Sequence, residues 1–301
     1  MFATLLSGLP NPDSTGDLDA ATALVVRAQE DAGLEPITDG RLGAPARDSV
    51  AAWRFAAGLT DRAVKQALPG PYSAGWFGGD DRTPGARRSA VLNAAEATRA
   101  HIEALAAAGC PMIEIEESEA HRIGEDEVER ELFREAHTHL LAGASGTHLS
   151  LSIVGKAAAA AGIETILAAP YASLAVDLID GPDNWNLVTR TPGERGIVVG
   201  AMGGRQANDE PREVLLWAAH YAASTKGRGI ERVGIGSAGS WANLSWPVAV
   251  RKMQALGEAA RLASLPPSEE LLDAVNPQSV SARRAALGSM ASRLPKPRTT
   301  L

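Results

Sequence analysis

The sequence predicts a (β/α)8 barrel, and three observations support this prediction. Eight short β-rich runs alternate with longer stretches of helical periodicity along the 301 residues. Most of these runs are followed by enough residues for a crossover helix, which is typical of parallel strands. The composition, with 45% hydrophobic and 22% charged residues, is that of an ordinary globular protein, and the length suits a single barrel. An open doubly wound sheet is the main alternative fold.

The expected strands are short runs of apolar or alternating residues that are bounded by turn residues. In chain order they span residues 2–7, 34–39, 64–68, 112–117, 148–154, 174–179, 196–202 and 232–238. The clearest helices are expected over residues 17–32, 90–108, 211–225 and 246–263. Leu18, Ala21, Val25 and Ala28 share one face of the first helix, and Gly33 is placed to end it.

The remaining segments define the expected domain organisation. The charged stretch 118–144 reads as helical, so the fourth crossover is expected to be enlarged. Residues 1–264 are assigned to one barrel domain. Residues 265–301 form a C-terminal extension with a short helical candidate and a basic tail, which is either an arm for homo-oligomer packing or a terminus without fixed structure.

Composition narrows the classes of function. Lys plus Arg is 29 and Asp plus Glu is 36, so the net charge of −7 argues against a broad nucleic-acid groove. The single cysteine, Cys110, excludes an intrachain disulfide framework and suits a cytoplasmic location. We find no basic signal-peptide start and no uninterrupted apolar window long enough for a membrane span. The expected partner is therefore a small molecule.

The barrel prediction directs attention to the carboxyl ends of the strands, where such folds carry their chemistry. Acidic and polar side chains lie on the expected strands near these ends, namely Asp39, Arg41, Glu114, Glu116, Glu117, His148, Ser150 and Asp177. Clustered carboxylates raise one another's pKa, which suits acid/base chemistry or cation binding. An internal salt bridge is favoured for Glu114. For Glu117 and His148, a structural and a functional interpretation are equally open.

Glycine-rich loops follow the last two expected strands. The loop after 196–202 contains Arg205, which together with backbone amides is suited to hold a phosphate or carboxylate. The loop after 232–238 matches G-x-G-x-x-G, but no further βαβ unit follows it, which argues against dinucleotide binding. Ordinary turn chemistry explains these glycines equally well.

Several segments together resemble the cobalamin-independent methionine synthase family, in particular its C-terminal catalytic barrel and the archaeal-type stand-alone forms. The similar segments are Ser7-Gly8-Leu9-Pro10, QEDAGLEPITDG at 29–40, Val64-Lys65, Gly70-Pro71-Tyr72-Ser73, IEIEES at 113–118, THLS at 147–150 and the stretch GSAGSWANLSWPVAVRKM. Their order matches over nearly the whole chain, to about residue 264. The resemblance implies the barrel fold of the uroporphyrinogen decarboxylase-like superfamily.

This resemblance also implies a zinc site, built in the family from a histidine, two cysteines and a glutamate. The histidine falls on His148, the first cysteine on Ser150 and the glutamate on Asp177. The second cysteine falls within Ser237–Trp241, where no cysteine exists. Because both thiolates are missing, we expect only a degenerate site at His148 and Asp177, without a bound metal.

From the same resemblance we expect a methyl, one-carbon or alkyl transferase acting on a small molecule, with folate as a candidate cofactor. Glu117 matches a substrate-contacting glutamate of the family, and Arg41 stands where the family has a glutamate. The expected catalytic residues are His148, Glu117 and Asp177, and the expected substrate-binding residues are Asp39, Arg41, Tyr72, Glu116, Ser150, Arg205, Ser237 and Trp241. The alternatives are a metal-free decarboxylase or lyase of a carboxylate substrate and a catalytically silent ligand-binding barrel.

Overall fold

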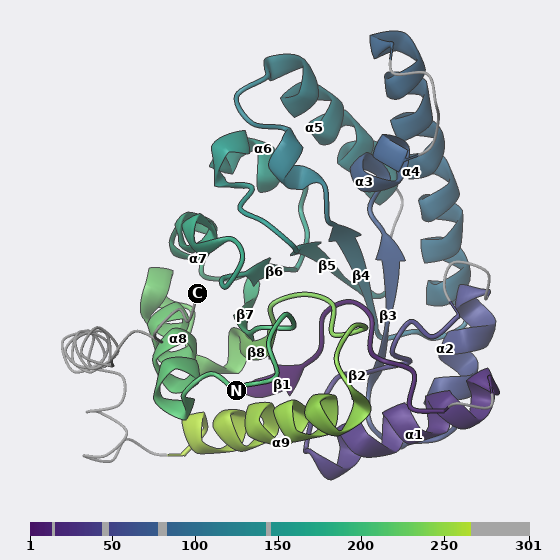
Figure 1. Cartoon of the computed structure of the whole chain (residues 1–301). Helices are drawn as coiled ribbons and strands as arrows, with labels where there is room; N and C mark the ends of the chain where they lie inside the picture. Colours follow the sequence, from purple (N-terminus) through teal and green to yellow (C-terminus); the bar gives the residue numbers. More distant parts are fainter. Residues whose placement is uncertain (14–15, 44–47, 78–82, 143–145, 266–301) are drawn as a thin grey trace, which may run out of the picture.

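The computed structural model describes residues 1–13, 16–43, 48–77, 83–142 and 146–265. Within these residues the chain forms a (β/α)8 barrel, as predicted, with its helices arranged around the strands (Figure 1). The eight parallel strands are β1 (Phe2–Thr4), β2 (Ile37–Thr38), β3 (Val64–Pro69), β4 (Met112–Glu117), β5 (His148–Ile153), β6 (Ser173–Asp177), β7 (Gly196–Met202) and β8 (Val233–Ser237). Residues 266–301, which make up nearly all of the expected extension, lie outside the described residues.

Helices connect each described strand to the next. They are α1 (Leu18–Asp31), α2 (Ser49–Ala57), α3 (Pro71–Phe77), α4 (Pro84–Ala107), α5 (Glu127–Leu141), α6 (Ile163–Ile166), α7 (Trp185–Arg190), α8 (Arg212–Ser224) and α9 (Trp246–Ala263). Single 3-10 turns add η1 (Ala120–Arg122), η2 (Ala159–Ala161), η3 (Pro182–Asn184), η4 (Thr225–Gly227) and η5 (Ile230–Arg232). The fourth crossover, which was expected to be enlarged, carries η1 and α5, whereas the third is longer and carries both α3 and α4.

Local sequence explains where several of these helices begin and end. A short polar side chain accepts backbone N–H groups at the start of four helices, which satisfies donors that the first turn leaves unpaired; these residues are Asp17, Asp48, Thr83 and Asp126. Gly33 and Gly109 follow the ends of α1 and α4 with φ of 75° and 93°. This left-handed backbone favours glycine and turns the chain towards the next strand. Among the described residues, no helix is both long enough and apolar enough to cross a membrane.

The barrel closes between β1 and β2 through individual hydrogen bonds rather than a strand ladder. Paired strands run in the order β1-β8-β7-β6-β5-β4-β3-β2. At the open seam, the N–H of Glu35 donates to the carbonyl oxygen of Ala3 at 2.8 Å, and the N–H of Leu9 donates to that of Gly40 at 2.9 Å. These bonds hold the two ends of the sheet together, so the carboxyl ends of the strands surround one mouth.

The inside of the barrel is partly apolar and partly polar. Phe2, Leu6, Val154, Ala175 and Val198 form an apolar cluster that is separate from the larger core under the helices. The polar part includes an ion pair between β3 and β4: the Lys65 ammonium donates to the Glu114 carboxylate at 2.7 Å, and both side chains are almost completely buried. The internal salt bridge that the sequence favoured for Glu114 is therefore confirmed. Burial raises the pKa of Glu114, while the positive charge of Lys65 acts in the opposite direction.

Candidate functional site

A cavity of about 550 Å³ opens at the carboxyl ends of the strands, and we call it the mouth cavity. Its position is the one where barrels of this fold carry their active sites. It is lined by Ser7, Glu116, Ser118, Val154, Gly155, Asp177, Asp180, Gly204, Arg205, Ala238, Gly239, Ser240, Asn243 and Leu244. These residues follow or end six strands, β1 and β4 to β8, so the cavity is assembled from segments far apart in the chain.

Asp177 is the buried carboxylate of the mouth cavity. It ends β6 and is fully buried, and its side chain faces inward because it alternates with Val176, which packs in the core under the helices. One carboxylate oxygen accepts the N–H groups of Ile179 and Asp180, both at 2.9 Å. The other accepts the N–H of Gly155 at 3.1 Å.

The surroundings of Asp177 shift its proton affinity. Burial raises the pKa of this carboxyl above its ordinary value, although the three backbone N–H groups lower it. A carboxyl group with a raised pKa at the mouth of a barrel is suited to take up or release a proton during a reaction.

Two ion pairs lie at the rim of the mouth cavity. The Arg41 guanidinium donates to the Glu116 carboxylate at 2.6 Å, and Glu116 is the more buried of the two. Arg205 donates to Asp180 at 2.9 Å, and this arginine is largely exposed. Each predicted rim arginine is therefore already paired with a carboxylate.

Ser7 contributes an unusual backbone to the cavity. It is a buried, non-glycine residue with φ of 65° that lines the mouth just beyond β1. Such a conformation costs free energy in a non-glycine residue, and residues of this kind are enriched at functional sites. Ser7 was not among the site residues expected from the sequence, although it begins the Ser7-Gly8-Leu9-Pro10 segment on which the family resemblance rests.

Asp180 also lines the cavity without having been expected there. The signal in the sequence was its spacing, because this second carboxylate follows Asp177 by three residues, just after the end of the strand.

His148 does not lie at the mouth, which corrects the sequence-based placement. It is the first residue of β5 and pairs in register with Met112, the first residue of β4, so it lies at the amino end of the barrel. There the residue is exposed overall, but its imidazole shares a hydrogen bond of 2.8 Å with the Ser173 hydroxyl, and partial desolvation of the ring lowers its pKa. Alternation correctly predicts that His148 shares a face with Ser150, but it does not fix the position along the barrel axis.

Glu117 and Tyr72 also point away from the mouth cavity. Glu117 is fully buried beneath α3, where its carboxylate accepts the N–H groups of Tyr72 and Ser73 at 3.0 and 2.8 Å. It also accepts the Ser73 hydroxyl at 2.5 Å and a ring nitrogen of His137 at 3.0 Å. The Tyr72 hydroxyl donates to Glu129 at 2.6 Å. These contacts hold α3 and α5 against β4.

The other predicted binding residues occupy three different places. The Ser237 hydroxyl bridges the N–H and carbonyl groups of Leu6, and Trp241 is buried with its indole N–H near the Met202 carbonyl. Ser150 lies inside the barrel at the level of Glu114, and its hydroxyl has no partner among the described residues. Asp39 directly follows β2 in the chain, and its carboxylate accepts the N–H of Arg41 at 2.9 Å. None of these four lines the mouth cavity.

The residues around Asp177 do not fit the zinc site that the resemblance implies. Among the described residues, no three histidine, cysteine, aspartate or glutamate side chains are close enough together to hold a metal ion. His148 and Asp177 lie at opposite ends of the barrel, and Cys110 is buried just before β4. We therefore derive no step through zinc.

Comparison with known proteins shows the fold. No family model matches the sequence, and no curated protein matches it. A B12-independent methionine synthase from Shewanella sp. W3-18-1, solved in complex with selenomethionine, superposes with a TM-score of 0.72 at 15% identity, over 90% of this chain and 98% of that one. A methyltransferase from Methanosarcina mazei superposes with a TM-score of 0.61 at 15% identity, over 87% and 94%. A D-psicose 3-epimerase from Clostridium cellulolyticum H10 gives 0.50 at 12% identity, over 87% and 99%.

Proposed function

We propose that this chain is an enzyme related to the B12-independent methionine synthases that transfers a methyl group to a small polar acceptor in the mouth cavity. The observation that carries the proposal is Asp177, a buried carboxyl group with a raised pKa that lines this cavity. The superposition with a methionine synthase over 90% of the chain supports the reaction class. The sequence resemblance points the same way, because its segments follow the same order along the chain.

In this proposal Asp177 acts as the base. The acceptor's X–H proton passes to a carboxylate oxygen of Asp177, and the electron pair of X attacks the methyl carbon of the donor. The bond between the methyl group and the donor atom breaks, and its electron pair stays on the donor. Asp177 then returns the proton to the leaving group or to solvent. Glu116 and Asp180, which line the cavity and are each paired with an arginine, supply charges that orient the acceptor at the rim.

The decarboxylase or lyase alternative would need the two ion pairs at the rim to open when its substrate binds. That alternative depended on Arg41 and Arg205 as cations for a carboxylate substrate, and both are paired with carboxylates of the chain. The third alternative is a catalytically silent barrel, which would bind a ligand but form no product from it. The experiment therefore measures both binding and turnover.

The test uses 13C-methyl donors, comprising a methylated folate and a sulfonium compound, with thiol and amine amino acids as acceptors. NMR detects a new 13C-methyl product, and calorimetry detects binding. We expect wild type to form product and Asp177→Asn to lose activity by at least about a hundredfold, as for loss of a general base. Asp183→Asn, which removes an exposed carboxylate from nearby η3, serves as the matched control and should keep full activity. Binding without product, or an active Asp177→Asn enzyme, would contradict the proposal.

A further inference from the structure

The segment after β7 forms one wall of the mouth cavity, and we call its residues 203–211 the β7 loop. Gly204 and Arg205 of this loop line the cavity. A methyl group added at Gly204 would lie 2.4 Å from the carbonyl oxygen of Ser240 and 2.6 Å from Cδ1 of Trp241, so the loop packs directly against the segment after β8. The shape of this wall therefore depends on where the β7 loop is held.

The β7 loop folds back on itself. At its start, the N–H of Gly203 donates to a carboxylate oxygen of Glu210, near its end, at 3.1 Å. Residues 205–208, which lie between them, are exposed. A loop with so much exposed chain keeps its shape only where other elements hold it.

A buried ammonium of α9 holds the returning half of the loop. The side chain of Lys252 has no exposed surface. Its Nζ donates to the carbonyl oxygen of Asn208 at 2.6 Å and lies 3.6 Å from the Glu210 carboxylate and 3.9 Å from that of Asp209. The nearer oxygen of Glu210, Oε2, is buried and has no hydrogen-bond partner among the described residues. Its negative charge is therefore compensated by Lys252.

The neighbouring cation of α9 is a weaker anchor. Arg251 donates to the Asp209 carboxylate at 3.0 Å and to the carbonyl oxygen of Ala207, but its side chain is 49% exposed. Water can replace an exposed guanidinium at these acceptors more easily than it can replace the buried ammonium of Lys252.

We propose that Lys252 is a positioning residue of the mouth cavity, which holds the β7 loop, and with it Gly204 and Arg205, against the barrel. Without Lys252, the buried Glu210 carboxylate loses its cation and the Asn208 carbonyl loses its donor, so the loop opens. An effect on acceptor binding rests on the function proposed above, whereas the position of the loop is measured without any substrate.

Amide hydrogen exchange, followed by NMR, measures this opening, because the Gly203 N–H is released when Glu210 moves away. Lys252→Met keeps an unbranched side chain but removes the charge. We expect Gly203 to exchange at least about tenfold faster than in wild type, the effect of losing a hydrogen bond to a charged group. The N–H of Leu178, which donates to Gly200 of β7, should keep its protection.

Two further variants complete the comparison. Arg261→Met removes an exposed cation from the same helix, where it pairs with Glu258, and should leave Gly203 exchange unchanged. Lys252→Gln retains an N–H donor for the Asn208 carbonyl but has no charge. It should also accelerate Gly203 exchange, and it provides the test if Lys252→Met fails to fold.

Kinetics separate positioning from general damage to the fold. In the methyl-transfer assay, Lys252→Met should raise KM for the acceptor more than it lowers kcat, because the β7 loop contacts the acceptor whereas the base, Asp177, belongs to β6. Absence of turnover in wild type would contradict the proposed function, and the exchange rates would still decide the role of Lys252.

Unchanged Gly203 exchange in folded Lys252→Met or Lys252→Gln would overturn the proposal. Equal acceleration of Gly203 and Leu178 would also overturn it, because the substitution would then weaken the whole barrel rather than release the loop. In an active enzyme, a lower kcat with unchanged KM would show that Lys252 does not position this wall for the acceptor.

Discussion

Glu116 and Glu117 are neighbours in β4, yet their carboxylates lie in unlike surroundings. Glu116 points inward, lines the mouth cavity and pairs with Arg41. Glu117 points outward and is buried under α3, where two backbone N–H groups and two side chains donate to it. Strand alternation therefore assigns one carboxylate to the cavity and its neighbour to the packing of α3 and α5.

The raised pKa of Asp177 makes a prediction about stability at this residue scale. The native carboxyl binds its proton more readily than the unfolded one, whose pKa is about 3.9. Between these two pKa values the native state binds more protons, so the contribution of Asp177 to the free energy of unfolding falls as pH rises. It is fully favourable below about pH 4 and is lost as pH rises through the native pKa.

Urea unfolding at a series of pH values from 4 to 7 checks this expectation. Relative to wild type, Asp177→Asn should become progressively more stable as pH rises, because the variant lacks the buried carboxylate. Asp183→Asn removes an exposed negative charge from the same loop region and serves as the control for net charge. Parallel curves for wild type and Asp177→Asn would show that Asp177 does not titrate in this way.

Close helix packing gives a prediction at the scale of elements. Helices α1 and α9 lie side by side along one side of the barrel, and Gly257 of α9 meets the end of α1 (Figure 1). A methyl group added at Gly257 would lie 1.7 Å from the carbonyl oxygen of Ala32, a backbone atom that can move only with its helix. The two helices can therefore approach this closely only because residue 257 is glycine.

Gly257→Ala should lower the free energy of unfolding by about 1 to 3 kcal/mol, the usual cost of overpacking. Gly85→Ala is the matched control, because Gly85 is also helical and nothing lies within 4 Å of an added methyl group there. The control should be neutral or stabilising by up to about 1 kcal/mol, since alanine favours helix. Chemical denaturation measures both variants, and equal stabilities would disprove the packing argument.

At the scale of the whole molecule, the junction of β1 and β8 depends on a side chain as well as on a strand ladder. β1 ends at Thr4, but the Ser237 hydroxyl continues the connection to β8 by accepting the N–H of Leu6 at 2.7 Å and donating to its carbonyl at 3.0 Å. Ser237 is almost fully buried, so water cannot replace these bonds easily.

Ser237→Ala should therefore destabilise the barrel by about 2 kcal/mol or more, because two buried backbone groups lose their partner. Ser240→Ala, which removes one exposed hydroxyl from the following loop, should cost much less. Thermal and urea unfolding compare the two variants. A stability of Ser237→Ala equal to that of Ser240→Ala would show that other contacts hold the chain after β1 against β8.

The sequence predicted the fold well and the site only in part, and the reason is physical. All eight strands were expected where they occur, because apolar runs between turn residues are local signals. β2 is shorter than expected, at two residues, since the expected run includes Pro36, which cannot donate to a ladder. Sequence periodicity reports which face a side chain takes, as for the inward-facing Asp177, whereas the height of His148 along the barrel axis depends on where β5 begins in the assembled barrel.

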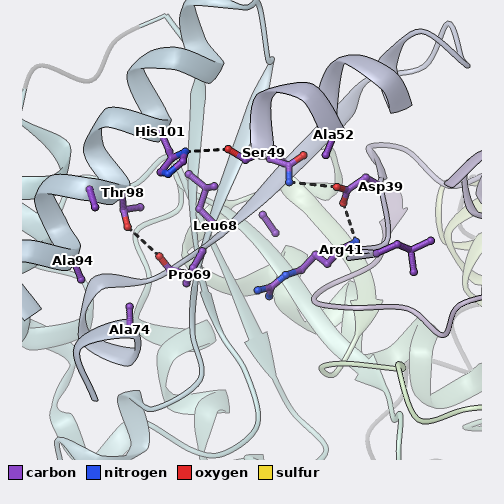
Figure 2. A pocket seen from close by; sticks show the side chains of 14 residues that line it. Asp39, Arg41, Ser49, Ala52, Leu68, Pro69, Ala74, Ala94, Thr98 and His101 are labelled. Atoms are coloured by element: carbon purple, nitrogen blue, oxygen red, sulfur yellow. Dashed lines mark hydrogen bonds between the residues drawn. The ribbon is translucent and has the colours of Figure 1, made fainter. Parts of the chain in front are cut away.

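The Arg41–Glu116 pair joins two hollows of the molecule. Arg41 lines a cavity of about 310 Å³ beside β3 (Figure 2), and its partner Glu116 lines the mouth cavity. A ligand that drew the Arg41 guanidinium away would leave the largely buried Glu116 carboxylate at the mouth without its cation. Thermodynamic linkage makes any such effect reciprocal, so an occupant of one cavity that breaks the ion pair would alter affinity at the other by the same factor in both directions.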